Sequence, residues 1–276
     1  MKQKAVPGSP FQMGRGLSIA VLILALCLVT CARPDETWSR VSETGILRVG
    51  MDASFPPFEY IAADGDVAGF DVDLARELGR RLGLEVQFVA NLPYDGLYDA
   101  LAVQRVDVVI SALVVNPARM ADFAYSASYF DAGQVLVLRT GEDGDAEAEA
   151  EIEGMMDLSG HTLAVEFGTQ GDLEARKWAR RLPDLTVVPC QTTGDAVAMV
   201  AAGEADGALV DHVSALAATG KDDRLIVVGE AVVGAPYAVA MRRESQRLLQ
   251  AINRALAEME RDGTMKALRA KWLEGR

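Results

Sequence analysis

The chain has 276 residues, of which 50% are hydrophobic and 24% are charged. This length allows two lobes with separate cores, and the composition is typical of a globular protein and excludes a wholly disordered one. The formal net charge of −13 at pH 7 indicates an acidic surface, which repels phosphate backbones. We therefore expect no nucleic-acid partner.

The first thirty residues have the pattern of an export signal. Three basic residues precede an unbroken apolar segment, residues 17–30, which is too short to cross a bilayer comfortably. The letters LVTC resemble a bacterial lipobox, although Thr30 stands where glycine, alanine or serine is usual. We expect residues 1–30 to be a signal peptide and Cys31 to carry a lipid anchor to the membrane. Ordinary secretion, with cleavage nearby, is the alternative.

Cysteine and histidine usage predicts neither a disulfide nor a metal site. Cys27 and Cys31 lie at the expected signal and anchor, so no internal disulfide can form in the mature monomer. Cys190 follows an apolar, strand-like run and is expected to be a small core residue. His161 and His212 lack the clustered spacing of transition-metal ligands, and we expect no cofactor.

Strands and helices alternate from Gly45 onward. Leu74, Leu78 and Leu82 share one face of an amphipathic helix, and short apolar runs predict the strands around it. The pattern in the first half predicts strands at 46–50, 84–90, 106–115 and 134–139, and helices at 70–83 and 94–105. An acidic stretch, 141–154, has no apolar periodicity and is expected to be a solvated surface segment.

The alternation restarts after the acidic stretch. The pattern there predicts strands at 162–168, 185–190, 205–210, 224–228 and 236–243, and helices at 172–182, 192–203, 212–218, 249–259 and 264–273. Strands that alternate with helices predict parallel-type α/β sheets.

Polar and aromatic residues collect where these strands end. In an open α/β sheet, ligands bind outside the carboxyl ends of the strands. The residues found there are Asp52, Phe55, Tyr94, Ser111, Asn116, Arg119, the turn 166–171 and Asp211. Their joint position predicts a ligand site.

Arg119 and Asp211 complement the two ends of a free α-amino acid. Asn116 can cap a following helix, whose free backbone N–H groups would lie beside the Arg119 guanidinium and bind a carboxylate. Asp211 can accept from an ammonium group, and Phe55 and Tyr94 can enclose what lies between. Each residue also has a structural interpretation: a surface ion pair for Arg119, a helix cap for Asp211, and core packing for the aromatic residues.

Residues 45 to about 275 resemble the polar amino-acid family of extracytoplasmic solute-binding proteins (family 3), the capture components of ABC importers. The matching stretches are GILRVGMDASFPPFEY, GDVAGFDVDLARELGRRLG, YDGLYDALAVQRVDVVISALVVNPAR, LAVEFGTQG, and PYAVAMRR followed by LLQAINRALAEMERDGTMKALRAKWL. They occur in order over almost the whole expected mature chain.

The resemblance implies an α/β, two-lobed periplasmic-binding-protein-like (type II) fold with two crossover strands as its hinge. Lobe 1 is expected at residues 45–134 plus 232–276, and lobe 2 at 135–231. A ligand that bonds to both lobes would stabilise the closed state over the open one.

The resemblance also implies roles for the site residues. Arg119 would hold the ligand carboxylate, and Asp211 its α-amino group. The other positions that match family contacts are Phe55 and Tyr94 for packing, Ser111, Ala112 and Val114 for backbone or hydroxyl contacts, Thr169 and Gln170 beside the carboxylate, and Asp52 at the side-chain head.

Two features of the matched region bear on the ligand. Ala112 replaces the usual glycine or serine, and Asn116 the usual threonine, so some hydroxyl contacts are absent. Glu166 occupies a position that varies with ligand class. Together with Asp52 it would place two carboxylates near the ligand side chain and favour a cation such as arginine or lysine. Exposure of Glu166 to solvent is the alternative.

We therefore expect a monomer that captures a free polar amino acid in the periplasm or at the cell surface and delivers it to an ABC-type permease, with cationic amino acids slightly favoured. We do not expect an enzyme. The alternatives are a secreted cyclohexadienyl dehydratase-like enzyme on the same fold, for which Glu166 is the only obvious general acid, and a ligand-sensing module.

Overall fold

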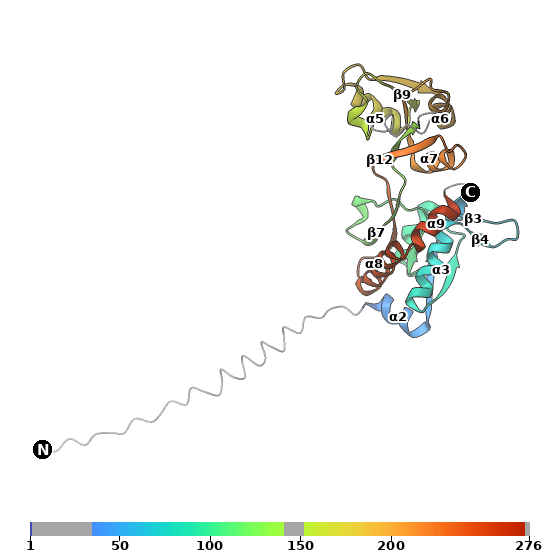
Figure 1. Ribbon diagram of the computed structural model, residues 1–276. Helices are drawn as coiled ribbons and strands as arrows, with labels where there is room; N and C mark the ends of the chain where they lie inside the picture. The colour runs from blue at the N-terminus through green and yellow to red at the C-terminus, as the bar shows by residue number, and fades with distance from the viewer. Residues whose placement is uncertain (2–34, 141–151, 274–276) are drawn as a thin grey trace. The chain divides into compact units, whose positions relative to one another are not determined.

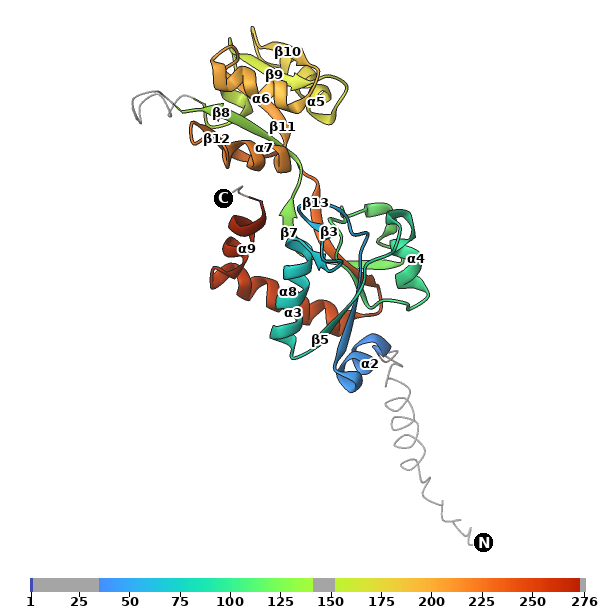
Figure 2. The ribbon, with the colours of Figure 1, turned by 90° about the vertical axis from the view of Figure 1, so that its right-hand side faces the viewer.

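The computed structural model describes Met1 and residues 35–140 and 152–273. The expected signal peptide 1–30 and Cys31 lie outside the described residues, as does most of the acidic stretch 141–154. The described part of the chain is a two-lobed α/β protein with one five-stranded sheet in each lobe (Figure 1; Figure 2). None of its helices is long and apolar enough to cross a membrane.

The sheet of lobe 1 is mixed and has the strand order β5-β1-β6-β13-β7. Its strands are β1 (Ile46–Gly50), β5 (Glu85–Val89), β6 (Val108–Val109), β7 (Phe123–Asp131) and β13 (Pro236–Arg242). β1 pairs in parallel with β5 and β6, whereas β13 is antiparallel to β6 and β7. The parallel half agrees with the predicted parallel-type sheet, and β13, through which the chain re-enters this sheet, is the strand that runs opposite to the others.

Helices pack on both faces of this sheet. They are α2 (Glu36–Thr44), α3 (Phe70–Leu82), α4 (Leu97–Ala102), α8 (Gln246–Arg261) and α9 (Thr264–Trp272), with 3-10 turns η1 (Tyr94–Gly96) and η2 (Pro117–Arg119). Leu74 and Leu78 are fully buried, as their spacing predicted. Gly79 lets α3 approach the sheet, since a Cβ there would lie 2.4 Å from Cγ2 of Val86.

A small antiparallel sheet extends lobe 1 between β1 and α3. Its strands are β2 (Ser54–Phe55), β3 (Glu59–Ile61) and β4 (Val67–Ala68). Phe55 and Glu59 pair across β2 and β3, which places an aromatic residue and a carboxyl group side by side just after β1.

Lobe 2 repeats the plan of lobe 1, with the strand order β10-β9-β11-β8-β12. Its elements are β8 (Gln134–Arg139), η3 (Met155–Asp157), β9 (Thr162–Glu166), α5 (Gln170–Ala179), β10 (Thr186–Cys190), α6 (Thr193–Ala202), β11 (Gly207–Asp211), α7 (His212–Thr219) and β12 (Leu225–Val233). β9 is parallel to β10 and β11, and β8 is antiparallel to β11 and β12. Cys190 is partly buried and packs at one of the two cores of this lobe.

The chain passes between the lobes twice, from β7 to β8 and from β12 to β13. Asp131 ties the two passages together, because its Oδ1 accepts hydrogen bonds from the N–H groups of Gly133 (2.8 Å) and Ala235 (2.7 Å). The passages run close to each other at this point. A Cβ on Gly133 would lie 1.9 Å from the carbonyl oxygen of Val233, so only glycine fits there.

The predicted strand 106–115 is wrong in extent. β6 has only Val108–Val109, and the chain then leaves the sheet, with Ala112 at a left-handed φ of 43°. Ile110 and Leu113 are nevertheless buried, in the two cores on opposite faces of the sheet. A short apolar run indicates burial, but it cannot distinguish a strand from a buried loop.

The helix expected after Asn116 is a single 3-10 turn, because β7 begins soon afterwards at Phe123. The predicted cap is present: the Asn116 side chain accepts from the N–H of Ala118 at 3.0 Å. β7 itself was not predicted, since its buried and exposed residues do not alternate regularly.

Replacement of Asp131 by alanine is expected to lower the free energy of unfolding by about 1–3 kcal/mol, because two backbone N–H groups lose their acceptor. Chemical denaturation followed by circular dichroism would measure this. Asp64→Ala is the matched control, since Asp64 also accepts from a backbone N–H, that of Asp66, but in an exposed loop. Equal losses in the two variants would contradict a special role for Asp131.

Candidate functional site

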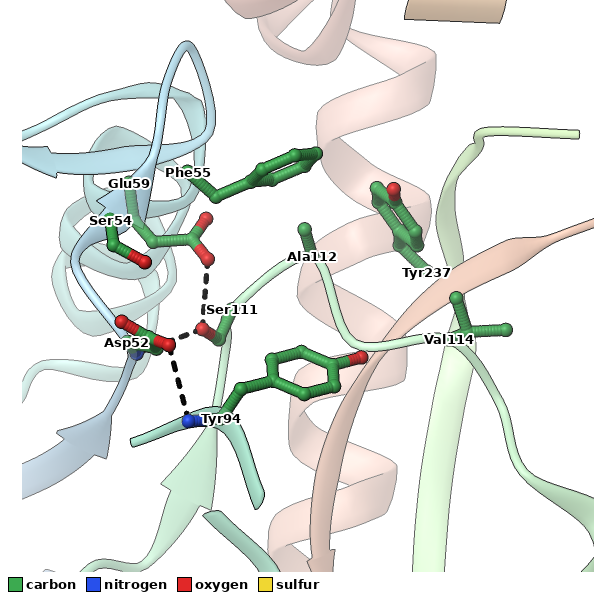
Figure 3. A pocket seen from close by; sticks show the side chains of 9 residues that line it. All are labelled: Asp52, Ser54, Phe55, Glu59, Tyr94, Ser111, Ala112, Val114 and Tyr237. Carbon is green, nitrogen blue, oxygen red and sulfur yellow. Dashed lines mark hydrogen bonds between the residues drawn. The ribbon is translucent and has the colours of Figure 1, made fainter. Parts of the chain in front are cut away.

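A cavity of about 330 Å³ lies at the carboxyl ends of β1 and β6. This is where an open α/β sheet binds ligands, and the volume is in the range of small-molecule sites. Its walls are Asp52, Ser54, Phe55, Glu59, Tyr94, Ser111, Ala112, Val114 and Tyr237 (Figure 3). All of them belong to lobe 1, and six of them are residues that the sequence analysis assigned to the site.

Asp52 and Ser111 join the loops that form the floor of the cavity. Oδ2 of Asp52 accepts from the backbone N–H of Tyr94 at 3.1 Å, and the N–H of Asp52 donates to Oγ of Ser111 at 3.0 Å (Figure 3). The end of β1, the turn η1 and the end of β6 are therefore fixed to one another. A carboxylate and a hydroxyl group consequently have set positions in the cavity floor.

The two predicted aromatic residues are not core residues. Phe55 is 45% exposed and Tyr94 is 50% exposed, and both rings border the cavity. Phe55 stacks on Phe58, which is fully buried, with ring centroids 5.8 Å apart and an interplanar angle of 11°. One face of Phe55 is thus supported by the core, and the ring is held in place beside the cavity.

Arg119 is exposed on η2 and is not part of the cavity wall. Its guanidinium lies over the ring of Tyr98, 5.1 Å from the centroid. The Tyr98 hydroxyl in turn forms a 2.7 Å hydrogen bond with the hydroxyl of Tyr125. In the described part of the chain, Arg119 forms no ion pair, so the structural interpretation of this residue as a surface ion-pair partner is not observed.

The predicted residues of lobe 2 lie at the carboxyl ends of its strands, and none of them lines the cavity of lobe 1. Asp211 caps α7, because its Oδ1 accepts from the N–H of Ser214 at 2.9 Å. Thr169 caps α5 by accepting from the N–H of Asp172 at 3.3 Å. The capping interpretation of Asp211 is therefore observed.

Glu166 and Gln170 have partners within lobe 2. Oε2 of Glu166 accepts from both the N–H (2.9 Å) and the hydroxyl (2.5 Å) of Thr193 at the start of α6. Gln170 is exposed, and its Nε2 donates to Glu174 at 3.3 Å. Glu166 thus stabilises the first turn of a helix and is only partly exposed.

Three wall residues, Ser54, Glu59 and Tyr237, were missed by the sequence analysis. Glu59 is 1% exposed, and its Oε1 accepts from the hydroxyl of Ser111 at 2.8 Å. Burial raises the pKa of Glu59, and the negative charges of Asp71 and Asp52 raise it further. The sequence signal that could have identified Glu59 is its position as a charged residue in the otherwise apolar and aromatic stretch PPFEY.

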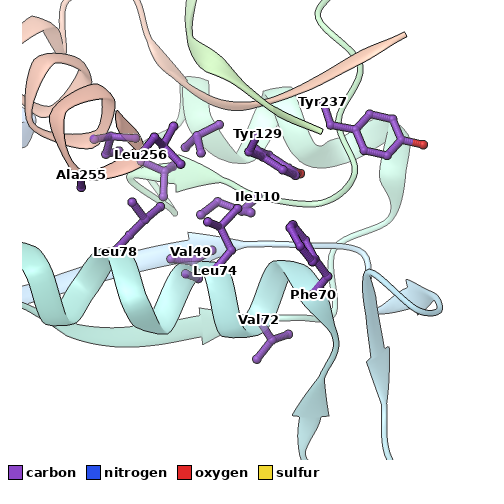
Figure 4. Packing of buried hydrophobic residues seen from close by; sticks show 14 of the residues in the cluster. Val49, Phe70, Val72, Leu74, Leu78, Ile110, Tyr129, Tyr237, Ala255 and Leu256 are labelled. Carbon is purple, nitrogen blue, oxygen red and sulfur yellow. The ribbon is translucent and has the colours of Figure 1, made fainter. Parts of the chain in front are cut away.

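Asp71 lies behind the cavity wall at the start of α3 and is fully buried. Its Oδ2 accepts from the N–H of Ala112 (2.6 Å) and from the hydroxyl of Tyr129 (3.0 Å). Tyr129 is held by stacking on Phe70, with centroids 6.0 Å apart (Figure 4). Burial raises the pKa of Asp71, whereas the two donors lower it. The left-handed turn at Ala112 aims its N–H at this carboxyl group.

The described residues contain no group of three His, Cys, Asp or Glu side chains that could hold a metal ion. The polar groups of the cavity are carboxyl, hydroxyl and phenol groups, together with backbone amides. This set can bind a polar organic molecule by hydrogen bonds while the aromatic rings cover its apolar part.

Glu166→Ala is expected to destabilise the protein by about 1–2 kcal/mol, because the first turn of α6 loses an acceptor that serves two donors of Thr193. Thermal unfolding without ligand would measure this. Glu204→Ala, at the other end of α6 and exposed, is the control and should change the stability by less than about 0.5 kcal/mol. Unchanged stability in Glu166→Ala would show that these contacts contribute nothing.

Known proteins resemble this chain over most of its length. The family model for bacterial extracellular solute-binding proteins, family 3, matches residues 47–275. The L-cystine-binding protein TcyJ of Escherichia coli is 31% identical over 258 residues, which cover 92% of this chain and 92% of the relative. The histidine-binding periplasmic protein of Escherichia coli is 29% identical over 262 residues, covering 92% and 96%.

Two solved structures support the same relationship. An ancestral cationic amino acid solute-binding protein is 30% identical, with a TM-score of 0.59, and the match covers 86% of this chain and 99% of that one. An ancestral cyclohexadienyl dehydratase is 27% identical, with a TM-score of 0.71 and coverage of 85% and 95%. The predicted two-lobed type II fold is thereby confirmed. With its cavity at the strand ends and a family match from residue 47 to residue 275, the chain belongs to family 3 of the bacterial extracellular solute-binding proteins.

Proposed function

We propose that this protein captures a free polar amino acid outside the cytoplasm and delivers it to an ABC-type permease. The observation that carries the proposal is the cavity, whose floor fixes the Asp52 carboxylate between two loops and whose rim has the exposed rings of Phe55 and Tyr94. The relatives support it, since their names describe cystine-binding, histidine-binding and cationic amino acid-binding proteins.

Arg119 and Asp211 are the residues proposed to bind the two ends of the amino acid. The Arg119 guanidinium is exposed and rests on Tyr98, so its planar fork of donors is available to a carboxylate. Asp211 is on the other lobe, as are Thr169 and Gln170. Contacts from both lobes would make the ligand stabilise the closed state.

The lobe boundaries belong to the same proposal: residues 45–134 plus 232–276 for lobe 1, and 135–231 for lobe 2. The two passages of the chain that Asp131 ties together would act as the hinge. Capture by a monomer that Cys31 anchors to the membrane through a lipid remains a prediction from the sequence.

Cationic amino acids such as arginine and lysine are the favoured ligands. The residues that line the cavity include two carboxyl groups, Asp52 and Glu59, and no basic side chain. A carboxyl group that is ionised in a partly enclosed cavity attracts a positive side chain more strongly than it would in open water. Glu166, on lobe 2, would place a further carboxylate near the ligand side chain through Oε1, the oxygen that does not bond to Thr193.

Arg119→Ala is expected to weaken the binding of every amino acid about 10- to 100-fold, because one charge-assisted hydrogen-bond pair contributes about 1.5–3 kcal/mol. Titration calorimetry on protein that has been unfolded and refolded, to remove carried-over ligand, would measure this. Arg105→Ala is the control, since Arg105 is exposed on the same lobe and lies outside the cavity. Equal affinities for the Arg119 variant and the unchanged protein would contradict the assignment.

A dehydratase-like enzyme is the second candidate, because the ancestral cyclohexadienyl dehydratase has the higher TM-score of the two structures, 0.71. Such an activity needs a general acid in the cleft. We expect no product from prephenate or arogenate in a direct assay. Turnover that Glu166→Gln abolishes would overturn the transport proposal in favour of the enzyme.

A further inference from the structure

Two buried carboxyl groups, Glu59 and Asp71, lie at the cavity and accept hydrogen bonds from the adjacent residues Ser111 and Ala112. Glu59, on β3, is 1% exposed, and Asp71, at the start of α3, is 0% exposed. Glu59 is a wall residue of the cavity, whereas Asp71 lies behind it. Two buried carboxylates without a cation are strongly unfavourable, so their protonation state needs an explanation.

Three donors form hydrogen bonds with the pair, and these bonds involve only two of its four carboxyl oxygens. Oε1 of Glu59 accepts from Ser111, and Oδ2 of Asp71 accepts from Ala112 and Tyr129. The other two oxygens, Oε2 of Glu59 and Oδ1 of Asp71, are buried and receive no hydrogen bond from the described residues. A single proton on Oε2 of Glu59, donated to Oδ1 of Asp71, would satisfy both.

In the part of the chain that the structure describes, the surroundings of the pair contain no neutralising charge. The titratable groups that face it from the neighbouring strands and turns are Asp52, Tyr94, Tyr129 and Tyr237. None of these is basic, and in the described chain neither Glu59 nor Asp71 forms an ion pair. Lys271, on the adjacent helix α9, bonds instead to Asp73 at 2.6 Å.

Burial is the main reason why both pKa values are raised above their usual range. For Glu59 the charges of Asp71 and Asp52 raise the pKa further, and the hydrogen bond from Ser111 opposes them. For Asp71 the hydrogen bonds from Ala112 and Tyr129 oppose the effect of burial. Two donors stabilise an anion at Asp71 and one does so at Glu59, so Glu59 is the better position for a shared proton.

We propose that Glu59 and Asp71 share one proton in the ligand-free protein, and that a cationic amino-acid side chain binding over Glu59 displaces this proton to solvent. The inference rests on the proposed function, because it needs an amino acid in this cavity. In the step, the O–H bond of Glu59 breaks and the proton passes to water or buffer. The ammonium or guanidinium of the ligand balances the charge left on Glu59.

This arrangement makes the affinity for cationic ligands depend on pH. Because the pKa of Glu59 is raised, this group carries its proton in the ligand-free protein at any pH below that pKa. A cation that binds over Glu59 requires the carboxylate form, so the proton must leave. If one proton is released, the dissociation constant for arginine falls about tenfold for each pH unit of increase. A neutral amino acid leaves the proton in place, so its affinity is independent of pH over the same range.

Calorimetric titration in two buffers with different ionisation enthalpies counts the protons released on binding. At neutral pH we expect about one proton to be released with arginine or lysine, and none with glutamine, by single-site linkage. Binding of arginine without proton release would overturn the inference and leave the proposed function intact. If no amino acid binds at all, the proposed function is wrong, and the proton release is wrong with it.

Glu59→Gln tests whether the released proton comes from Glu59. The amide of the variant can still accept from Ser111 and donate to Asp71, but it cannot be deprotonated. In this variant we expect no proton release with arginine and a flat dependence of arginine affinity on pH. Glu85→Gln, an exposed glutamate of the same lobe, is the matched control and should behave as the unchanged protein. Proton release that persists in Glu59→Gln would overturn the assignment.

A measurement without ligand tests the shared proton directly. The infrared spectrum of the ligand-free protein at neutral pH should contain the C=O stretch of a protonated carboxyl group, and Glu59→Gln or Asp71→Asn should remove or shift it. Addition of arginine should remove it in the unchanged protein. Absence of any such band that depends on Glu59 would overturn the inference, even if one of the variants folds poorly.

Discussion

A continuous series of hydrogen bonds across the strand ends of lobe 1 is the interaction on which the site depends. The N–H of Tyr94 donates to Asp52, the N–H of Asp52 donates to Ser111, and the hydroxyl of Ser111 donates to Glu59. The backbone hydrogen bonds between the strands end at this edge of the sheet. Side chains of neighbouring segments therefore bond to the backbone N–H groups there. This holds four separate segments at fixed distances, and the cavity is the space they enclose.

Three carboxyl groups lie at the same edge, and no basic side chain of the described residues forms an ion pair with them. Asp52 faces the cavity, Glu59 forms part of its wall, and Asp71 is enclosed behind it by Tyr129 and the turn at Ala112. A carboxyl group in such surroundings either stays protonated or acquires a positive partner. Both outcomes are consistent with a protein that binds amino acids, since the ligand itself can supply the positive charge.

Much of the site followed from the sequence because the carboxyl end of a parallel strand can be recognised from the strand itself. Asp52, Ser111 and Asp211 were found in this way, and each lies at the carboxyl end of its strand, although only Asp52 and Ser111 line the cavity. The apolar run 106–115 was misread as one strand, since Ile110 and Leu113 are buried without forming a ladder. Glu59 and Asp71 were missed because their proximity depends on how β3 and α3 pack, which no local pattern reports.

The sequence by itself determined the alternation of strands and helices, the family relationship and the acidic balance of the chain. These are properties of residue order, through the periodicity of burial and the positions of turn residues. Only the tertiary structure decided that Glu166 bonds to Thr193 at the start of α6, that Arg119 rests on Tyr98, and that Glu59 and Asp71 are both buried at the cavity. Contacts between residues far apart in the chain set the protonation and orientation of side chains, and these contacts exist only after folding.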